Sequence, residues 1–511
     1  MVLLRDQNNF MGIMKRSFLS LLFFGFISCA TSQVELKSYQ DIRVDDLEFS
    51  YPKISSYELS NGLKIFYKPD HELPFVTVKL YLPGGHLYES RDKLGYFDFL
   101  GKMIRDGGIE GVRLEDVDIK LESIGAAIES GYTADYGTIA FNCLKEDLPE
   151  VSKLFKQFVR SPAFNPARLE VLKSIKLESI KRRGENPDVV AGIMSNKAIY
   201  GEDSDYSTLQ SVESIKKLNV KELKELYHLY SRPNGSYVGI SGDLSEEEIK
   251  NLTQDLFADW PRSEQQLEKK KIAPEFNPEG GKFTSWATEQ NKSSIRPRIY
   301  LLNRSLQQST VQISHLGLKR DLADRYIINL YGESYSGGNF SSLFFQRIRT
   351  QLGLVYGIFG GFSPDQDIGE YNVMFQTRNS KVGEAIKETL NLIQATREMV
   401  IPSDQLELVT TGIKNGFVFR FASSANQVNR AIIKEIYNYE KDFDEKFFER
   451  LSAISGENIR DFSAKNINPS QFSIVVVGGT SVDQLRSELG ANFDYYTFEF
   501  DDEVKNVKKV N

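Results

Sequence analysis

Few side chains in this sequence could hold a catalytic metal. Hydrolysis at a zinc ion needs three deprotonated protein ligands, an open position for water and a carboxylate that serves as general base. The 511 residues include four histidines, and no two of them have the spacing of a metal-binding pair on a helix. They are His71, His86, His228 and His315. We do not expect a new site that joins His71 to His86, because His86 lies in a turn-forming sequence.

A charged pair stands on one predicted helix. Residues 95–104 read Gly-Tyr-Phe-Asp-Phe-Leu-Gly-Lys-Met-Ile and follow a strand and a Pro-Gly-Gly turn. Asp98 and Lys102 are four residues apart with the acid N-terminal, the order that favours an ion pair on one helix face. Two separately solvated charges are the alternative. The segment does not fit a phosphate-binding P-loop, because five residues rather than four separate Gly95 from Gly101.

A second pair, Arg349 and Tyr356, could bind a carbonyl or a developing oxyanion. Arginine offers a fixed fork of donors and tyrosine offers one directional hydroxyl. A loop with Gly337 and Gly338 precedes the pair, and such a loop lets a substrate backbone approach closely. The structural alternative is an arginine that caps a helix, followed by a core tyrosine on the next strand.

Strand and helix patterns alternate along the chain and would position these pairs. Asn61-Gly62 predicts a hairpin turn between the first two strands. Strands are predicted at 54–59, 63–67, 75–82 and 236–241, and helices at 114–123, 148–158, 167–183, 220–229 and 245–257. The strand patterns of 76–84 and 236–242 recur at 309–317 and 473–479, both about 235 residues later. Two similar halves joined by a linker are the simplest account.

The N-terminus predicts export. Met14-Lys15-Arg16 is a basic start, and the apolar run 17–27 has the length of a signal peptide rather than of a membrane span. Translation could begin at Met1 or at Met14. Phe26-Ile-Ser-Cys29 resembles a bacterial lipoprotein box, so we expect a lipid on Cys29, with plain secretion as the alternative. Cys143, in a strand-like alternation, then has no disulfide partner and is expected to be a small buried hydrophobe.

Composition excludes some classes of function. The net charge is −7, and no block of lysine and arginine is present, so nucleic-acid binding is not expected. The predicted organisation is a signal peptide and lipoprotein anchor, a tether, a first half, a linker, a second half and a tail. The corresponding ranges are 1–33, 34–53, 54–264, 265–296, 297–495 and 496–511.

Several segments, in order and spacing, resemble the insulinase/pitrilysin family of metallopeptidases over about residues 50–495. They are Leu59-Ser-Asn-Gly-Leu-Lys64, Gly84-Gly-His-Leu-Tyr-Glu89, Tyr230-Ser-Arg-Pro-Asn-Gly235, Gly239-Ile-Ser-Gly-Asp243, Gly337-Gly-Asn-Phe-Ser-Ser-Leu-Phe-Phe-Gln-Arg-Ile-Arg349 and Gly353-Leu-Val-Tyr356. The resemblance implies an α+β fold of two similar half-domains. Each is a mainly antiparallel sheet with helices packed on one face, and together they form a bowl. Two bowls then close over a peptide chamber.

The resemblance also implies which positions would carry zinc. Asp98 and Lys102 stand where the family has two histidines, Gly101 stands at the general base, and Ser179 stands at a later glutamate ligand. Lys102 is a cation at neutral pH and cannot bind zinc, and Gly101 offers no base. Neighbouring Glu178 is expected to point elsewhere on its helix. We therefore expect no metal in this chain.

The second half resembles the part of the family that holds substrate. Arg349 and Tyr356 match an arginine and tyrosine pair with which active members hold the substrate backbone, and in two-chain bacterial relatives the chain without zinc carries this pair. Gly337 and Gly338 match the accompanying loop. One departure is Ser342-Leu343-Phe344, where the family often has Ser-Arg-Leu.

Three hypotheses follow for function. The leading one is a non-catalytic subunit of a zinc peptidase heterodimer in the bacterial cell envelope, anchored by lipid, with a zinc-bearing partner and a peptide substrate. The second is a peptide-binding or scaffold protein without a peptidase partner. The third, an active peptidase with an unorthodox zinc site, is disfavoured by the small number of ligands.

Overall fold

The computed structural model describes residues 49–510 apart from 203, 268–295, 322 and 366–367. Residues from Tyr51 onward form one compact unit. The predicted signal peptide and anchor with Cys29, the two candidate starts, most of the tether and most of the linker lie outside the described residues. Among the helices that are described, none has both the length and the apolar character needed to span a membrane.

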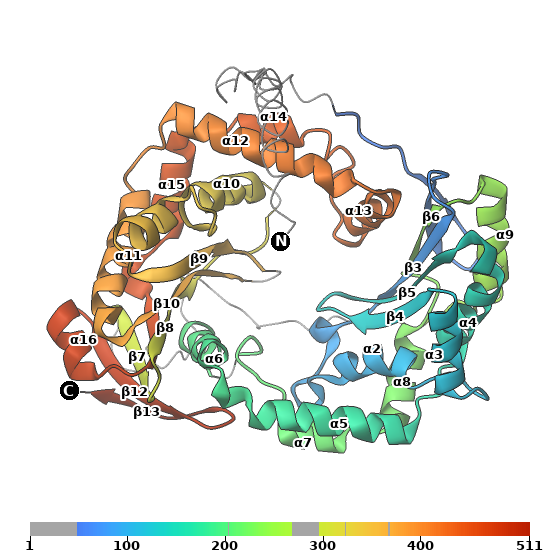
Figure 1. Ribbon diagram of the computed structural model, residues 1–511, viewed down its shortest axis with the longest axis horizontal. Coiled ribbons are helices and arrows are strands. Elements are labelled where there is room, and N and C mark those ends of the chain that lie inside the picture. Colours follow the sequence, from blue (N-terminus) through green and yellow to red (C-terminus); the bar gives the residue numbers. More distant parts are fainter. Residues whose placement is uncertain (1–48, 203, 268–295, 322, 366–367, 511) are drawn as a thin grey trace, which may run out of the picture. The chain divides into compact units, whose positions relative to one another are not determined.

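The first half is built on a mixed sheet that is mainly antiparallel (Figure 1). Its strands are β1 (Ser55–Glu58), β2 (Lys64–Pro69), β3 (Phe75–Pro83), β4 (Ala127–Tyr132), β5 (Tyr136–Leu144) and β6 (Tyr237–Gly242). Their order across the sheet is β1-β2-β6-β3-β5-β4, and only β2 and β6 run parallel. The hairpin at Asn61-Gly62 joins β1 to β2, with Gly62 at a φ of 88° that glycine adopts without strain.

The second half repeats this arrangement. Its strands are β7 (Arg298–Asn303), β8 (Gln308–Leu316), β9 (Val355–Ser363), β10 (Glu370–Arg378), β11 (Ser473–Gly478), β12 (Asp494–Phe500) and β13 (Val504–Val510). The run β7-β11-β8-β10-β9 matches β2-β6-β3-β5-β4 in order and in relative direction. The predicted α+β fold of two similar halves is therefore confirmed.

Helices flank both sheets. In the first half they are α2 (Tyr96–Asp106), α3 (Leu114–Ser123), α4 (Leu148–Arg160), α5 (Pro166–Lys181), α6 (Pro187–Tyr200), α7 (Val212–Lys217), α8 (Val220–Tyr230) and α9 (Glu246–Phe257). In the second they are α10 (Asp324–Tyr331), α11 (Val382–Thr396), α12 (Ser403–Phe417), α13 (Ser424–Ile436), α14 (Phe447–Ser452), α15 (Gly456–Asn466) and α16 (Val482–Leu489). Two π-helices, η6 (Gly332–Ser336) and η7 (Phe345–Gln351), precede β9.

Each sheet also receives a helix from the other half, which the sequence did not indicate. Helix α6 packs on β8 and β11 of the second sheet, and α13 packs on β6 and β2 of the first (Figure 1). The strands supply alternate residues to these contacts: Leu80 faces the helices of its own half, whereas Tyr81 lies in the cluster with Val428 and Ile432 of α13. Each sheet therefore has helices on both faces, and one of the helices on each sheet comes from the other half.

A glycine makes room for one exchanged helix. A side chain at Gly239 in β6 would begin 2.8 Å from a methyl of Val428 and 3.0 Å from a methyl of Ile432. On the other sheet, the Ser195 hydroxyl of α6 donates to the Ser314 hydroxyl of β8 at 2.8 Å, where both residues are buried. These close contacts join the two halves into one folding unit.

Replacement of Ile432 by alanine tests the exchange. Ile432 is fully buried, so Ile432→Ala should lower the free energy of unfolding by about 2–5 kcal/mol. Amide hydrogen exchange should rise in β6, although this strand lies far from Ile432 in the sequence. The matched control is Ile119→Ala at a helix position that is 66% exposed, which should change neither quantity. Unchanged protection of β6 in Ile432→Ala would contradict the exchange.

Candidate functional site

Helix α2 begins at a buried carboxylate. Glu89, which is 4% exposed, accepts hydrogen bonds from the backbone N–H groups of Gly95 at 2.9 Å and Phe97 at 2.7 Å. A carboxylate at this end satisfies free N–H groups and complements the helix dipole. His86 Nδ1 lies 3.3 Å from Glu89, and this hydrogen bond raises the pKa of the imidazole. These contacts fix where the predicted charged pair stands.

Gly101, which the sequence resemblance places at the general base, has no room for a side chain. A Cβ atom on Gly101 would lie 2.7 Å from the Tyr132 backbone nitrogen and 2.8 Å from the Gly131 Cα, both in edge strand β4. The Ser130 hydroxyl also donates to the Gly101 carbonyl at 2.5 Å. A glutamate at position 101 would therefore require β4 to move.

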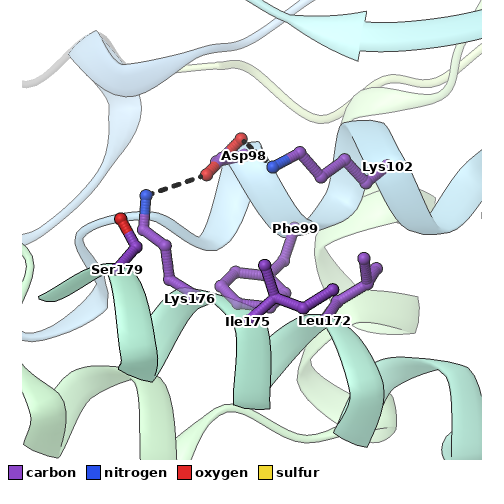
Figure 2. Close-up of a pocket in the computed structure, with 7 residues that line it drawn as sticks. All are labelled: Asp98, Phe99, Lys102, Leu172, Ile175, Lys176 and Ser179. Atoms are coloured by element: carbon purple, nitrogen blue, oxygen red, sulfur yellow. Dashed lines mark hydrogen bonds and ion pairs between the residues drawn. The ribbon is translucent and has the colours of Figure 1, made fainter. Parts of the chain in front are cut away.

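Helices α2 and α5 enclose a small pocket of about 60 Å³ (Figure 2). Asp98, Lys102 and Ser179, three of the positions singled out in the sequence, all line it. Asp98 Oδ1 lies 3.3 Å from Lys102 Nζ, so the predicted ion pair forms. Asp98 Oδ2 lies 3.3 Å from Lys176 Nζ of α5, so the carboxylate also joins the two helices. The pocket floor is apolar and consists of Phe99, Leu172 and Ile175.

The charges in this pocket oppose a metal ion. Burial acts to raise the pKa of the Asp98 carboxyl, but the ammonium groups of Lys176 and Lys102 outweigh burial and hold that pKa below its usual range. Asp98 is therefore ionised at neutral pH and faces two cations. Within the described residues, no three His, Cys, Asp or Glu side chains are grouped so that they could hold a metal ion.

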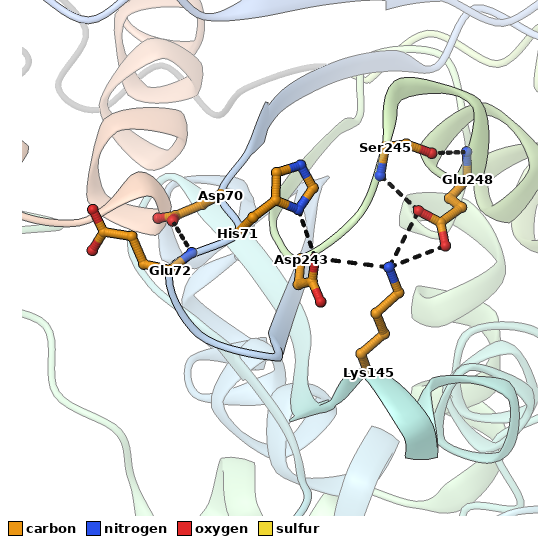
Figure 3. Close-up of polar contacts among 7 residues, drawn as sticks. All are labelled: Asp70, His71, Glu72, Lys145, Asp243, Ser245 and Glu248. Carbon is orange, nitrogen blue, oxygen red and sulfur yellow. Dashed lines mark hydrogen bonds and ion pairs between the residues drawn. The ribbon is translucent and has the colours of Figure 1, made fainter.

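The histidines have other partners. His71 Nδ1 lies 2.6 Å from Asp243, beside the ion pairs of Lys145 with Asp243 and Glu248 (Figure 3). His86 contacts Glu89, so the two histidines have different carboxylate partners. His315 is buried, which lowers its pKa to about 4, and it stays neutral at physiological pH. Cys143 is fully buried on β5 as predicted, and burial raises the pKa of its thiol to about 12.

Arg349 lies in a cluster of three aromatic rings, of which those of Phe340 and Tyr356 are exposed and that of Phe345 is buried. Its guanidinium carbon is 4.4 Å from the centre of the Phe345 ring, 5.3 Å from that of Phe340 and 5.4 Å from that of Tyr356. Tyr356 is 88% exposed, so the alternative of a core tyrosine is wrong. Tyr356 and Gly357 together oppose Gln376 of β10, and this bulge in edge strand β9 redirects the strand where Tyr356 projects.

The two glycines that precede the pair shape their own loop. Gly338 has a φ of 80°, and a Cβ atom there would lie 2.2 Å from the ring of Phe359, which is 54% exposed. A Cβ atom on Gly337 would lie 2.8 Å from the Gly332 carbonyl oxygen. Both glycines therefore let the loop pack closely on β9 and on η6. Their role in substrate binding stays a prediction.

Sequence reasoning missed three residues of these sites. Lys176 lies three residues before Ser179, on the same face of its helix, and that spacing could have indicated it. Phe340 and Phe359 reach Arg349 and Gly338 through the tertiary fold, and no local pattern marks them.

Comparisons with known proteins agree on one family. Residues 64–211 match the family described as insulinase (peptidase family M16), and residues 217–411 match the peptidase M16 inactive domain. A protein of Bacillus subtilis named uncharacterized zinc protease YmxG is 21% identical over 428 residues, 83% of this chain and 98% of that protein. A protein of Helicobacter pylori named non-peptidase homolog YmxG is 20% identical and covers 80% of this chain and 91% of that protein.

Two solved structures have the same fold. A peptidase M16 inactive domain from Pseudomonas fluorescens superimposes with a TM-score of 0.71 at 20% identity, over 84% of this chain and 99% of that one. A protease from Helicobacter pylori gives a TM-score of 0.71 at 14% identity, over 84% of this chain and all of that one. At these identities the similarity establishes the fold alone.

Gly101→Ala tests the close contact between α2 and β4. It should lower the free energy of unfolding by about 1–3 kcal/mol, because backbone atoms of β4 must shift. The control is Gly412→Ala in α12, where a Cβ atom would meet nothing within 4 Å. There alanine should raise stability by up to about 1 kcal/mol through its helix propensity. Chemical denaturation measures both, and a Gly101→Ala protein as stable as the parent would contradict the packing argument.

Asp98→Asn tests the charge bridge. It should lower the free energy of unfolding by about 1–2 kcal/mol at neutral pH, because two ammonium groups lose their shared carboxylate. The folded pKa of Asp98 is depressed, so its stabilisation is present above the ordinary value of 3.8 and is lost as pH falls through the lower, folded value.

The difference between the parent and Asp98→Asn should therefore shrink in urea denaturations taken below about pH 4. Glu178→Gln, at an exposed position on the same helix α5, is the control and should show no comparable effect at any pH. A difference that stays constant into strong acid would contradict the bridge.

Proposed function

The chain belongs to the insulinase family of peptidases, and we propose that it is a non-catalytic subunit of a zinc peptidase complex. In this proposal the chain contributes part of the chamber wall and holds the substrate backbone. A partner subunit supplies zinc and the general base. The observation that carries the proposal is the contrast between the two halves. In the first half, the positions that the resemblance assigns to zinc and its base hold an aspartate, a lysine, a serine and a glycine, and a second lysine lies beside them. The second half presents a half-buried Arg349 beside an exposed Tyr356.

Chemistry by the isolated chain is disfavoured on two grounds. The pocket between α2 and α5 holds two ammonium groups that would repel a divalent cation. The base position would need β4 to move before it could hold a carboxylate. No single substitution would both remove the two ammonium groups and make room for a carboxylate at position 101. Homologues are named zinc proteases, and another is named a non-peptidase, so the family contains both kinds of name.

The geometry around Arg349 suits the binding of a peptide carbonyl. Three aromatic rings lie 4.4–5.4 Å from the guanidinium carbon and hold the group by cation–π contacts, which do not use its N–H donors. The Tyr356 hydroxyl, on the bulged edge strand, adds one more donor. Donors fixed before substrate arrives stabilise developing negative charge without reorganisation. In the proposed complex these donors would act on a bond that the partner's zinc attacks.

The proposal also covers the location of the chain and one alternative function. We propose that Cys29 carries a lipid that anchors the chain in the bacterial cell envelope. The rival function is a peptide-binding or scaffold protein that has no peptidase partner. A neighbouring gene that encodes an intact His-x-x-Glu-His motif would favour the subunit over the scaffold.

Arg349→Ala, measured in the complex with the zinc-bearing subunit, tests the proposed role. The mutation should lower kcat by about 10²–10³-fold, because one transition-state donor is removed. Arg347→Ala is the matched control: it lies on the same π-helix, and its guanidinium is 3.6 Å from Glu388, so it has a structural partner. Peptide hydrolysis by the Arg347→Ala complex should match that of the parent complex.

Two results would contradict this role. One is an Arg349→Ala complex that retains full kcat. The other is chelator-sensitive cleavage by the isolated chain with one zinc bound, which would restore the hypothesis of an unorthodox active site.

A further inference from the structure

A groove of about 1130 Å³ lies in the second half, apart from the cluster around Arg349. One wall is α12, and the other is formed by α10, η6 and the loop of Gly337. Along α12 the groove runs from Gln405 to Phe417, which is about 18 Å of helix. An extended peptide of roughly six residues has this length.

The groove side of α12 is open. Leu408 is 71% exposed, and Val409 and Ile413 are only partly buried. A Cβ atom on Gly412 or Gly416 would meet nothing within 4 Å. Of the residues of this helix, Phe417 is the buried one. An aliphatic helix face with two open glycines allows a second backbone to approach closely.

One end of the groove is cationic. Arg420 lines the groove there, with its guanidinium carbon 5.3 Å from the centre of the Phe417 ring. Arg430 lies over the same ring at 5.2 Å. The nearby carboxylate, Asp444, pairs with Arg430 and Lys434. Among the described residues no carboxylate lies within ion-pair distance of Arg420, so its charge is available to a ligand.

The opposite wall carries buried hydroxyl groups without partners. Ser334 and Tyr335, both on π-helix η6, line the groove, and within the described residues neither hydroxyl has a hydrogen-bond partner. Tyr335 is only 2% exposed. A buried hydroxyl without a partner is costly, so a ligand that supplies an acceptor would be favoured at this wall.

We propose that this groove binds the carboxyl-terminal segment of an apolar peptide. Aliphatic side chains of the peptide lie against Leu408 and Ile413. Its carbonyl groups accept hydrogen bonds from Ser334 and Tyr335 after these hydroxyl groups, which are buried in the free chain, turn toward the groove. The terminal carboxylate binds Arg420. An acyl chain of similar length would leave the two hydroxyls unpaired, so the observations favour a peptide over a fatty acid. The proposal concerns this chain by itself and does not depend on a zinc-bearing partner.

Fluorescence anisotropy with the purified full chain tests the proposal. The probe is an N-terminally labelled six-residue peptide of leucine and valine with a free carboxyl terminus, compared with the same peptide as a C-terminal amide. The free acid should bind at least about tenfold more tightly, because a charge-assisted hydrogen bond is lost in the amide. Arg420→Gln should remove this difference, whereas Arg347→Gln, which lies outside the groove, should preserve it.

A second variant keeps the test independent of Arg420. Gly412→Leu fills open space on α12, so the protein should keep its thermal stability and should lose at least about tenfold in affinity for the free acid. Equal affinity for acid and amide in the parent chain would overturn the proposal. Palmitate that binds in the groove while the peptide does not would overturn it in favour of a lipid site.

Discussion

The exchange of two helices is the constraint on which the rest of the structure depends. Helix α6 covers the second sheet and α13 covers the first, so neither sheet is complete without a helix from the other half. The contact is close, because Gly239 lets α13 lie against the sheet. Each half therefore covers part of the other half's sheet. The joined halves carry both the pocket between α2 and α5 and the aromatic cluster around Arg349.

In the first half, packing and charge both oppose a metal ion at the positions that the sequence resemblance indicates. Edge strand β4 lies so close to α2 that Gly101 cannot carry a side chain, and Asp98 joins Lys102 to Lys176 across the pocket. The charge bridge ties α2 to α5, a link that a metal ion with ligands on both helices would otherwise make. The second half instead places Arg349 of η7 beside the exposed Tyr356 of the bulged edge strand β9. The two halves share a strand order but differ in the side chains that they present: a charge bridge in the first and hydrogen-bond donors in the second.

Local signals in the sequence predicted much of the fold and part of the candidate sites. Short-range spacing was sufficient to predict three features. They are the hairpin at Asn61-Gly62, the alternating strands, and the ion pair of Asp98 with Lys102. The exchanged helices could not be predicted, because α6 has apolar residues on most of its sides and its pattern does not say which sheet it covers. Phe340 and Phe359 were missed for a similar reason, since they meet their partners only after the elements pack.

The central claim is that this chain works with a zinc-bearing subunit and holds no metal itself. Affinity capture of the tagged full chain from the native cells, with mass spectrometry and metal analysis of the purified material, tests this most directly. The account predicts a stoichiometric second chain with an intact His-x-x-Glu-His motif, and zinc that follows that chain when the two are separated. Zinc that stays with this chain, or a preparation that contains only this chain, would contradict it.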